Sequence, residues 1–218
     1  MARSQQATPT GYALLGLLSF GRQLTGYELK QFADSSLRFF YVAPAMSQVY
    51  SELGKLEASG LVKGRDTVDG ARTVRVHSIS RRGMSALRRW LAECPVDPPS
   101  LKHHLALRVF LGHMTDPEQL LTQVDQQRSW CEQTLDDLAI VRAGLDDDPA
   151  DQWRHARMVA EWGLDYYRAE LDALDRLANR LTDASATPAA SVTWLRSIPD
   201  RVSGSVAGRA SVTVTTPR

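Results

Sequence analysis

The side chains best suited to chemistry form a short polar set within one predicted helix. Its members are Ser47, Gln48, Tyr50, Ser51 and Lys55. Their spacing places the serines, the glutamine and the lysine on one side of a helix, with the tyrosine at its margin. Hydroxyl, amide and ammonium groups donate to or accept from base edges and phosphates. A solvated helix face has the same composition, so the neighbouring elements must decide between the two interpretations.

Sequence patterns for other chemistry are absent. The chain has no phosphate-binding glycine loop, no nucleophile elbow and no paired-histidine metal motif. His103 and His104 are adjacent, so on a helix they point about 100° apart and do not share a metal easily. We therefore expect no enzyme, no cofactor and no metal site. Cys94 and Cys131 are the two cysteines, which suits a reducing cytoplasm without a disulfide framework.

The charge is divided along the chain, although the formal net charge is only +1. Residues 1–93 hold 13 lysines and arginines against 7 acidic residues, a net +6, whereas residues 94–182 hold 9 against 16, a net −7. A basic first part suits a polyanion, and an acidic second part suits a protein or ligand partner. No apolar run reaches the roughly 18 residues that a membrane span requires, so we expect a cytoplasmic protein without a membrane partner.

Helix signals organise the first part of the chain. Thr8-Pro9 predicts a helix start with a hydroxyl cap and a proline in the first position. Thr25 and Glu28 have the spacing of a capping box, which predicts a second helix. The predicted third helix carries the polar set above and ends at Gly60.

A hairpin signal follows the third helix at once. Two β-branched runs flank Asp69-Gly70, a strong turn dipeptide between strands. Ser80 then caps a fourth predicted helix. The hairpin carries three arginines suited to backbone or minor-groove contact: Arg65, Arg72 and Arg75.

Three helices, a hairpin and a further helix predict a winged helix-turn-helix over residues 1–93. In this fold the third helix enters the major groove of DNA, and the hairpin reaches along the duplex. The free N–H groups near Thr25 suit a phosphate. With the wing and the basic charge behind it, the polar helix face is interpreted as a DNA contact rather than as a solvated face.

Long helical periods fill residues 94–182, which we predict to form a dimerisation and effector domain after the proline-rich junction "CPVDPPS". A heptad seam runs from Ala160 to Leu181 and predicts helix-on-helix packing. We assign its members to the dimer interface: Leu164, Tyr167, Leu171, Leu174 and Leu181. Trp90 is the aromatic chosen for stacking on a small aromatic effector, although aromatic side chains also serve as core. Residues 183–218 lack a period and are predicted to be a disordered tail.

Four segments together resemble the PadR family of bacterial transcriptional regulators. They are "GYALLGLL", "TGYELKQF", "AMSQVYSELGKLEASGLVKG" and "VHSISRRGMSAL". Residues 101–182 resemble the helical C-terminal domain of the virulence-activator-like branch of that family. The resemblance implies a mainly α fold with a small β-hairpin, a homodimer made by C-terminal helices, and a response to small aromatic molecules. The wing of this chain departs from the family pattern because Asp66 and Asp69 make its tip less basic.

These observations predict a homodimeric repressor that binds a pseudo-palindromic operator in double-stranded DNA and is released by a small-molecule effector. Its two recognition helices would meet half-sites about 34–36 Å apart. The alternative is a winged-helix adaptor that binds proteins and not DNA. The salt dependence of binding distinguishes the repressor from the adaptor, because DNA binding through lysine and arginine weakens steeply as the salt concentration rises.

Overall fold

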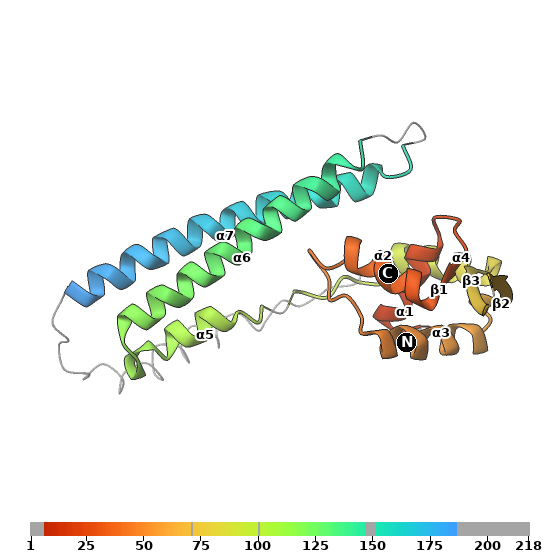
Figure 1. The fold of residues 1–218 in the computed structure, drawn as a ribbon, viewed down its shortest axis with the longest axis horizontal. Helices are drawn as coiled ribbons and strands as arrows, with labels where there is room; N and C mark the ends of the chain where they lie inside the picture. Colours follow the sequence, from red (N-terminus) through yellow and green to blue (C-terminus); the bar gives the residue numbers. More distant parts are fainter. Residues whose placement is uncertain (1–6, 71, 100, 147–150, 187–218) are drawn as a thin grey trace, which may run out of the picture.

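The computed structural model describes residues 7–70, 72–99, 101–146 and 151–186, which form a mainly helical chain with one small sheet (Figure 1). In chain order the elements are α1 (Pro9–Leu18), β1 (Leu24–Thr25), α2 (Gly26–Ser36), α3 (Met46–Ala58), β2 (Val62–Asp69), β3 (Arg72–Ile79), α4 (Arg81–Glu93), α5 (His104–Phe110), the 3-10 helix η1 (Gly112–Met114), α6 (Pro117–Ala143) and α7 (Arg154–Ala186). This mainly α architecture with a winged helix-turn-helix followed by long helices confirms the predicted fold class.

The predicted helix starts are confirmed by their hydrogen bonds. The backbone N–H of Gly11 donates to Thr8 Oγ1 at 3.0 Å, and Pro9 opens α1. Ser80 Oγ accepts from the N–H of Gly83 at 2.9 Å at the start of α4. After α3, Gly60 has a φ of +71°, a left-handed conformation that glycine adopts at little cost. The chain therefore turns sharply from α3 into β2.

The hairpin of β2 and β3 is confirmed, and a third strand joins it. β2 and β3 pair antiparallel from Val62 opposite Ile79 to Asp69 opposite Arg72. β1 pairs with the other edge of β3, so the strand order is β1-β3-β2. The sequence did not predict β1, because two residues are too few to show an alternating pattern.

The first hydrophobic core lies within the winged helix, between its helices and its sheet. It gathers apolar side chains from α1, β1, α2, α3, β2 and α4: Tyr12, Leu14, Leu15, Leu17, Leu18, Leu24, Leu29, Ala33, Val49, Leu53, Leu56, Leu61, Val62, Ala86 and Leu87. Gly83 allows α4 to approach closely, since a Cβ there would lie 2.1 Å from the carbonyl oxygen of Leu61.

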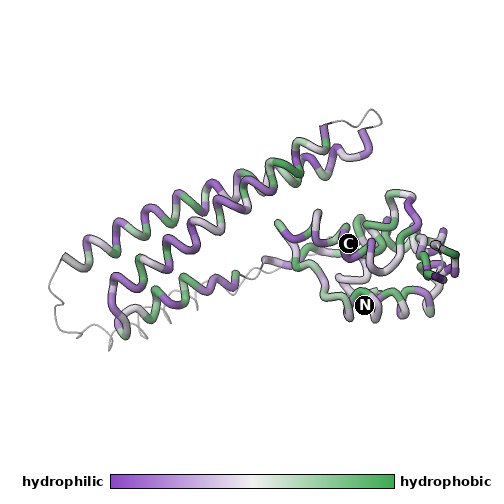
Figure 2. The backbone as a smooth tube through the Cα atoms, viewed as in Figure 1, coloured by the Kyte–Doolittle hydropathy of each residue, from purple (hydrophilic) through white to green (hydrophobic). Residues whose placement is uncertain are grey.

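The second core lies between α6 and α7, which run antiparallel as a long pair (Figure 1). Hydrophobic and hydrophilic stretches alternate along both helices in Figure 2, as expected for helices with one packed stripe. Phe39, from the loop between α2 and α3, is buried in this second core. The loop therefore links the winged helix to the long helices.

Two predicted boundaries differ from the structure. The sequence of residues 101–114 predicts one short helix, whereas the structure has α5 followed by η1 there. α7 continues to Ala186, so the first residues of the predicted disordered tail are helical. Residues 187–218 of that tail lie outside the described residues. Within the described ranges, no helix has the length and apolar character needed to cross a membrane.

Candidate nucleic-acid interface

The predicted polar face of α3 is exposed as expected. Ser47, Gln48, Ser51 and Lys55 all lie on the solvent side, and Tyr50 is 55% exposed. The opposite side of α3 is apolar and packs into the first core through Val49, Leu53 and Leu56, each at most 2% exposed. The helical period alone produces this division, because side chains three and four residues apart share a face.

Two members of the polar face are held by their own chain. Gln48 Oε1 accepts a hydrogen bond from the backbone N–H of Ala45 at 2.9 Å, which caps α3. Lys55 Nζ lies 2.7 Å from Glu52 Oε1. Glu52 Oε2 also accepts from the hydroxyl of Thr8 at 2.7 Å. These contacts tie the base of the face to α1 and set the directions of the amide and the ammonium group.

Glu52 is a buried carboxylate that the sequence analysis missed. Burial raises the pKa of Glu52, but hydrogen bonds from Lys55 and Thr8 outweigh it and lower the pKa below its usual value. Glu52 therefore stays ionised and holds α1 against α3. The sequence around Glu52 offered no signal, because its burial depends on where α1 crosses α3.

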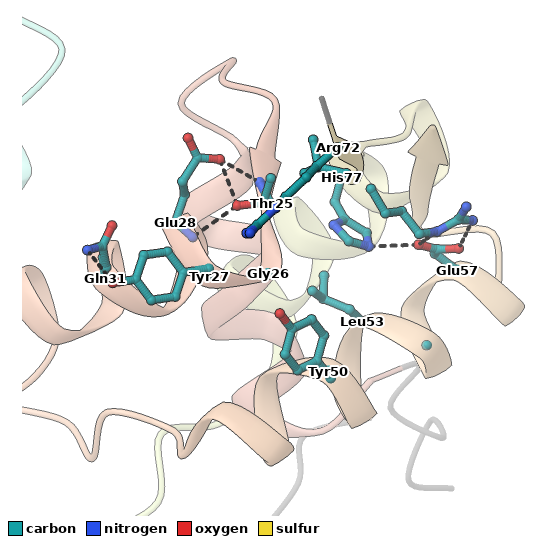
Figure 3. A pocket seen from close by; sticks show the side chains of 13 residues that line it. Thr25, Gly26, Tyr27, Glu28, Gln31, Tyr50, Leu53, Glu57, Arg72 and His77 are labelled. Atoms are coloured by element: carbon teal, nitrogen blue, oxygen red, sulfur yellow. Dashed lines mark hydrogen bonds and ion pairs between the residues drawn. The ribbon is translucent and has the colours of Figure 1, made fainter. Parts of the chain in front are cut away.

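A cleft of about 830 Å³ separates the start of α2 from α3 and the wing (Figure 3). Its walls come from α2, α3 and β3: Thr25, Gly26, Tyr27, Glu28, Gln31, Tyr50, Leu53, Gly54, Glu57, Arg72, Val74, Arg75 and His77. Four predicted site residues, Thr25, Tyr50, Arg72 and Arg75, thus line one surface feature.

The start of α2 is built for a close approach. Thr25 Oγ1 accepts from the N–H of Glu28 at 3.2 Å, and Glu28 Oε2 accepts from the N–H of Thr25 at 2.8 Å, completing the predicted capping box. This backbone hydrogen bond from Thr25 lowers the pKa of Glu28. The ring of Tyr50 covers Gly26, where a Cβ would lie 2.5 Å from Tyr50 Cε1. The first-turn N–H groups of Gly26 and Tyr27, which lack intrahelical partners, border the cleft.

The three wing arginines have different surroundings. Arg72 is exposed at the cleft, and Arg65 Nη2 donates to Gln23 Oε1 at 3.2 Å. Arg75 is instead bound to two carboxylates, those of Glu57 and Asp66. Hydrogen bonds to Glu57 and Asp66 raise the pKa of Arg75. The structure therefore brings Arg75 to the wing but turns three of its donors toward its own chain.

Trp90, the predicted effector residue, packs on the first core. Its ring stacks on Tyr12 with centroids 4.8 Å apart and planes 7° apart. One face of the indole is therefore already covered. An effector role for Trp90 stays a prediction.

An apolar pocket of about 560 Å³ lies elsewhere, between the winged helix and the long helices. Phe20, Phe32, Phe39 and Phe40 line it from one side, and Trp153 and residues of α6 and α7 line it from the other. The Trp153 ring lies 4.3 Å from that of Phe20, between centroids. The stretch "SLRFFYVAP" (residues 36–44) predicts a loop rich in aromatic residues, but the sequence does not indicate that this loop faces α6 and α7.

The predicted dimer seam packs inside the chain. Tyr167 and Leu174 are buried against α6, and Leu164, Leu171 and Leu181 pack partly buried beside them. Because α6 of the same chain accounts for this burial, an interface through these residues stays a prediction. Exposed apolar side chains lie instead before, on and after α5: Leu101, Leu107, Phe110, Leu111 and Met114.

His103 and Cys131 have structural surroundings in the described part of the chain. No group of three or more histidine, cysteine, aspartate or glutamate side chains is placed to hold a metal ion there. His103 Nε2 lies 2.7 Å from Glu170 Oε1, and its Nδ1 accepts from the N–H of Ala106, so it caps α5. Burial raises the pKa of the Cys131 thiol to about 11, which suits a core residue.

Comparison with known protein families and sequences gives two kinds of match. The family described as "Virulence activator alpha C-term" matches residues 101–182. The negative transcriptional regulator PadR of Bacillus subtilis is 31% identical over 100 residues, which are 45% of this chain and 54% of that protein. The match thus spans about half the length of that relative. A probable transcriptional regulator of Mycobacterium tuberculosis is 26% identical over 173 residues, which are 73% of this chain and 90% of that protein.

Comparison with solved structures shows the same fold. Bacillus subtilis PadR in complex with operator DNA matches with a TM-score of 0.70 and 21% identity, over 80% of this chain and 99% of that one. The same protein in complex with p-coumaric acid matches with a TM-score of 0.64 and 20% identity, over 79% and 98%. The Vibrio cholerae virulence activator AphA matches with a TM-score of 0.61 and 23% identity, over 80% and 98%. The Bacillus subtilis and Mycobacterium tuberculosis relatives are both named as transcriptional regulators.

Proposed function

The chain is a PadR-like protein in sequence and fold, and from this premise we propose that it is a homodimeric, sequence-specific DNA-binding repressor released by a small aromatic effector. The exposed polar face of α3 beside an arginine-bearing wing carries the proposal. This face combines hydroxyl, amide and ammonium groups on a helix whose other side is fully packed. Such a helix enters the major groove and reads base edges.

The cleft beside α3 supports contacts to the DNA backbone. Arg72 and Tyr50 border it, and the first-turn N–H groups of α2 face a phosphate that passes there. Lys55 of α3 and Arg65 of β2 add two exposed cations to the winged helix. In this arrangement Ser47, Gln48 and Ser51 specify the sequence, whereas Thr25, Arg65 and Arg72 position the duplex.

The exposed apolar residues around α5 support the proposed dimer. Leu105 of α5 is buried against the second core, whereas Phe110 and Met114 are each about 80% exposed. A continuous group of exposed apolar side chains marks an interaction surface. A second copy that covers this surface would fix the distance between two α3 helices at about one turn of DNA, roughly 34–36 Å.

Effector release follows from the pocket between the winged helix and the long helices. The pocket takes in Phe39 and Phe40, which belong to the loop that leads into α3. Tyr167 Oη donates to the carbonyl oxygen of Phe39 at 3.0 Å, so α7 holds this loop directly. A flat aromatic molecule that enters the pocket would shift the loop and α3 with it. The probe is p-coumaric acid, the ligand in one of the related structures.

The test is fluorescence anisotropy with DNA from upstream of the protein's own gene and with scrambled DNA, at two salt concentrations. We expect tight and selective binding that weakens as salt rises, because the release of counterions from DNA favours binding less at high salt. Addition of p-coumaric acid should weaken binding to the operator. Absence of binding to either DNA at low salt would reject the proposal and favour the adaptor. A monomer at micromolar concentration in sedimentation would reject the dimer.

A further inference from the structure

The contact between α3 and the wing centres on the carboxylate of Glu57. Glu57 lies in the last turn of α3, and its side chain is 23% exposed. Its Oε2 accepts from Arg75 Nη2 at 2.7 Å, and its Oε1 accepts from Arg75 Nε at 3.2 Å. His77 Nε2 lies 2.9 Å from the same Oε1 (Figure 3). Since Arg75 and His77 are two residues apart on β3, both side chains leave the strand on the same face.

The backbone of β2 is shaped around this contact. Gly64 pairs with His77 across the hairpin. A Cβ on Gly64 would lie 2.4 Å from Glu57 Oε1 and 2.6 Å from Arg75 Nη2. Gly64 has no positive φ, so the position requires space rather than glycine's conformational freedom. The carboxylate and the guanidinium therefore lie directly over β2, and three elements meet at one ion pair.

His77 shows that the contact reaches into the interior. Its side chain is 6% exposed, and Nδ1 has no hydrogen-bond partner among the described residues. The bond from Nε2 to Glu57 is thus the polar contact that orients this buried ring. Removal of the Glu57 side chain would leave both ring nitrogens of His77 without a partner among the described residues in a buried site, which proteins rarely tolerate.

We propose that Glu57 is a positioning residue that holds the wing at a fixed angle to α3, and that Arg75 acts through Glu57 rather than by contact with a DNA phosphate. The inference rests on the proposed DNA-binding function. Arg75 Nη1 also donates to Asp66 Oδ1 at 3.0 Å, so its Nε, Nη1 and Nη2 all donate within the chain. The phosphate contacts of the wing fall to Arg65 and Arg72.

Glu57→Gln separates this role from simple electrostatics. Removal of a negative charge near DNA strengthens binding if charge alone matters. If Glu57 holds the wing in place, its replacement lets the wing move relative to α3 and weakens operator binding. We expect operator affinity to fall about 10-fold, while affinity for scrambled DNA stays unchanged or rises. Asp66→Asn is the matched control, because it removes one carboxylate from the same arginine but breaks no bond to α3. Its operator affinity should stay unchanged or rise. A rise in operator affinity for Glu57→Gln would overturn the proposal.

Salt dependence tests Arg75 directly. Each phosphate contact contributes about −0.9 to the slope of log affinity against log salt. We expect Arg72→Ala to reduce the steepness of this slope by about one contact. Arg75→Ala should weaken operator binding and leave the slope as in the parent. A reduced slope for Arg75→Ala would show a phosphate contact and overturn its assignment.

Amide hydrogen exchange in the free protein tests the role of Glu57 without DNA. We expect Glu57→Gln to raise amide exchange about 10-fold or more in β2 and β3 and to leave α6 unchanged. If the variant does not fold, Arg75→Lys takes its place, since lysine keeps the charge but loses the bidentate geometry. Unchanged exchange in β2 and β3 would overturn the proposal. If the parent binds no DNA, the proposed function fails, and exchange still decides whether Glu57 holds the wing.

Discussion

The hydroxyl of Tyr167 is expected to hold the loop that leads into the recognition helix. It donates to the carbonyl oxygen of Phe39 at 3.0 Å, and both residues are 6% exposed. Burial raises the pKa of Tyr167, so the phenol stays neutral and remains a donor. Tyr167→Phe removes one oxygen atom and keeps the ring that packs edge-on against Trp130. The variant therefore isolates the hydrogen bond from the packing.

The expected cost follows from the burial of the acceptor. A buried carbonyl that loses its donor costs about 1–3 kcal/mol. For a chain of this size, each kcal/mol lowers the melting temperature by about 2–4 °C. We expect urea unfolding of Tyr167→Phe to show a free energy of unfolding about 1–3 kcal/mol lower than that of the parent. Operator affinity should fall as well, because the released loop no longer fixes the start of α3.

Tyr166→Phe is the matched control for this prediction. Tyr166 precedes Tyr167 on α7 and is 46% exposed, and its hydroxyl makes no hydrogen bond within the part of the chain that the structure describes. The same chemical change there should leave the free energy of unfolding within about 0.5 kcal/mol of the parent. Equal stabilities for the two variants would refute the role of the Tyr167 hydroxyl.

Three further predictions concern the winged helix. Gly83→Ala should destabilise the protein by about 1–3 kcal/mol in urea unfolding, because the added Cβ would lie 2.1 Å from the carbonyl oxygen of Leu61; a parent-like midpoint would contradict the close approach. Thr25→Ala should cost about 1 kcal/mol through loss of the cap on α2, and Thr25→Ser should recover most of it. The depressed pKa of Glu52 stabilises the fold above its usual value of 4.5, and this contribution is lost as pH falls through the lower folded-state pKa. Urea unfolding between pH 3 and 7 should therefore show a parent advantage over Glu52→Gln at neutral pH that disappears in acid; a constant difference would refute it.

Local signals predicted the winged helix well. Thr8, Thr25 and Ser80 each cap the helix that their spacing indicated, and Gly60 ends α3 in the left-handed conformation. Caps and tight turns involve residues within a few positions of one another, so their chemistry is visible in a short stretch of sequence. The exposed face of α3 follows from the same short range, because a helix repeats every 3.6 residues.

The sequence predicted the β2–β3 hairpin but not the contacts across it. It predicted Asp69-Gly70 as the turn, but Asp69 belongs to β2 and pairs with Arg72. The observed register places Asp66 opposite Arg75 and Gly64 opposite His77. The partner that completes the cluster, Glu57, belongs to another element. Its approach depends on how the wing folds back on α3, which a strand pattern does not contain.

The heptad seam shows the limit of periodicity most clearly. A repeat of three and four residues requires another helix to pack against, but it does not say which one. In the structure α6 of the same chain packs against Tyr167 and Leu174. The seam was interpreted as a surface for a second copy, and the exposed apolar residues around α5 now suit that role better.

The sequence by itself determined the order of the helices, the helix caps, the place of the β2–β3 hairpin and the polar face of α3, since each depends on neighbours close in the chain. The tertiary structure alone decided the burial of Glu52, the Glu57 contact with β3, and the aromatic pocket closed by Trp153 and Phe39. These features join residues tens of positions apart. Their distances depend on how whole helices pack, and packing is set by the summed burial of many side chains rather than by any local pattern.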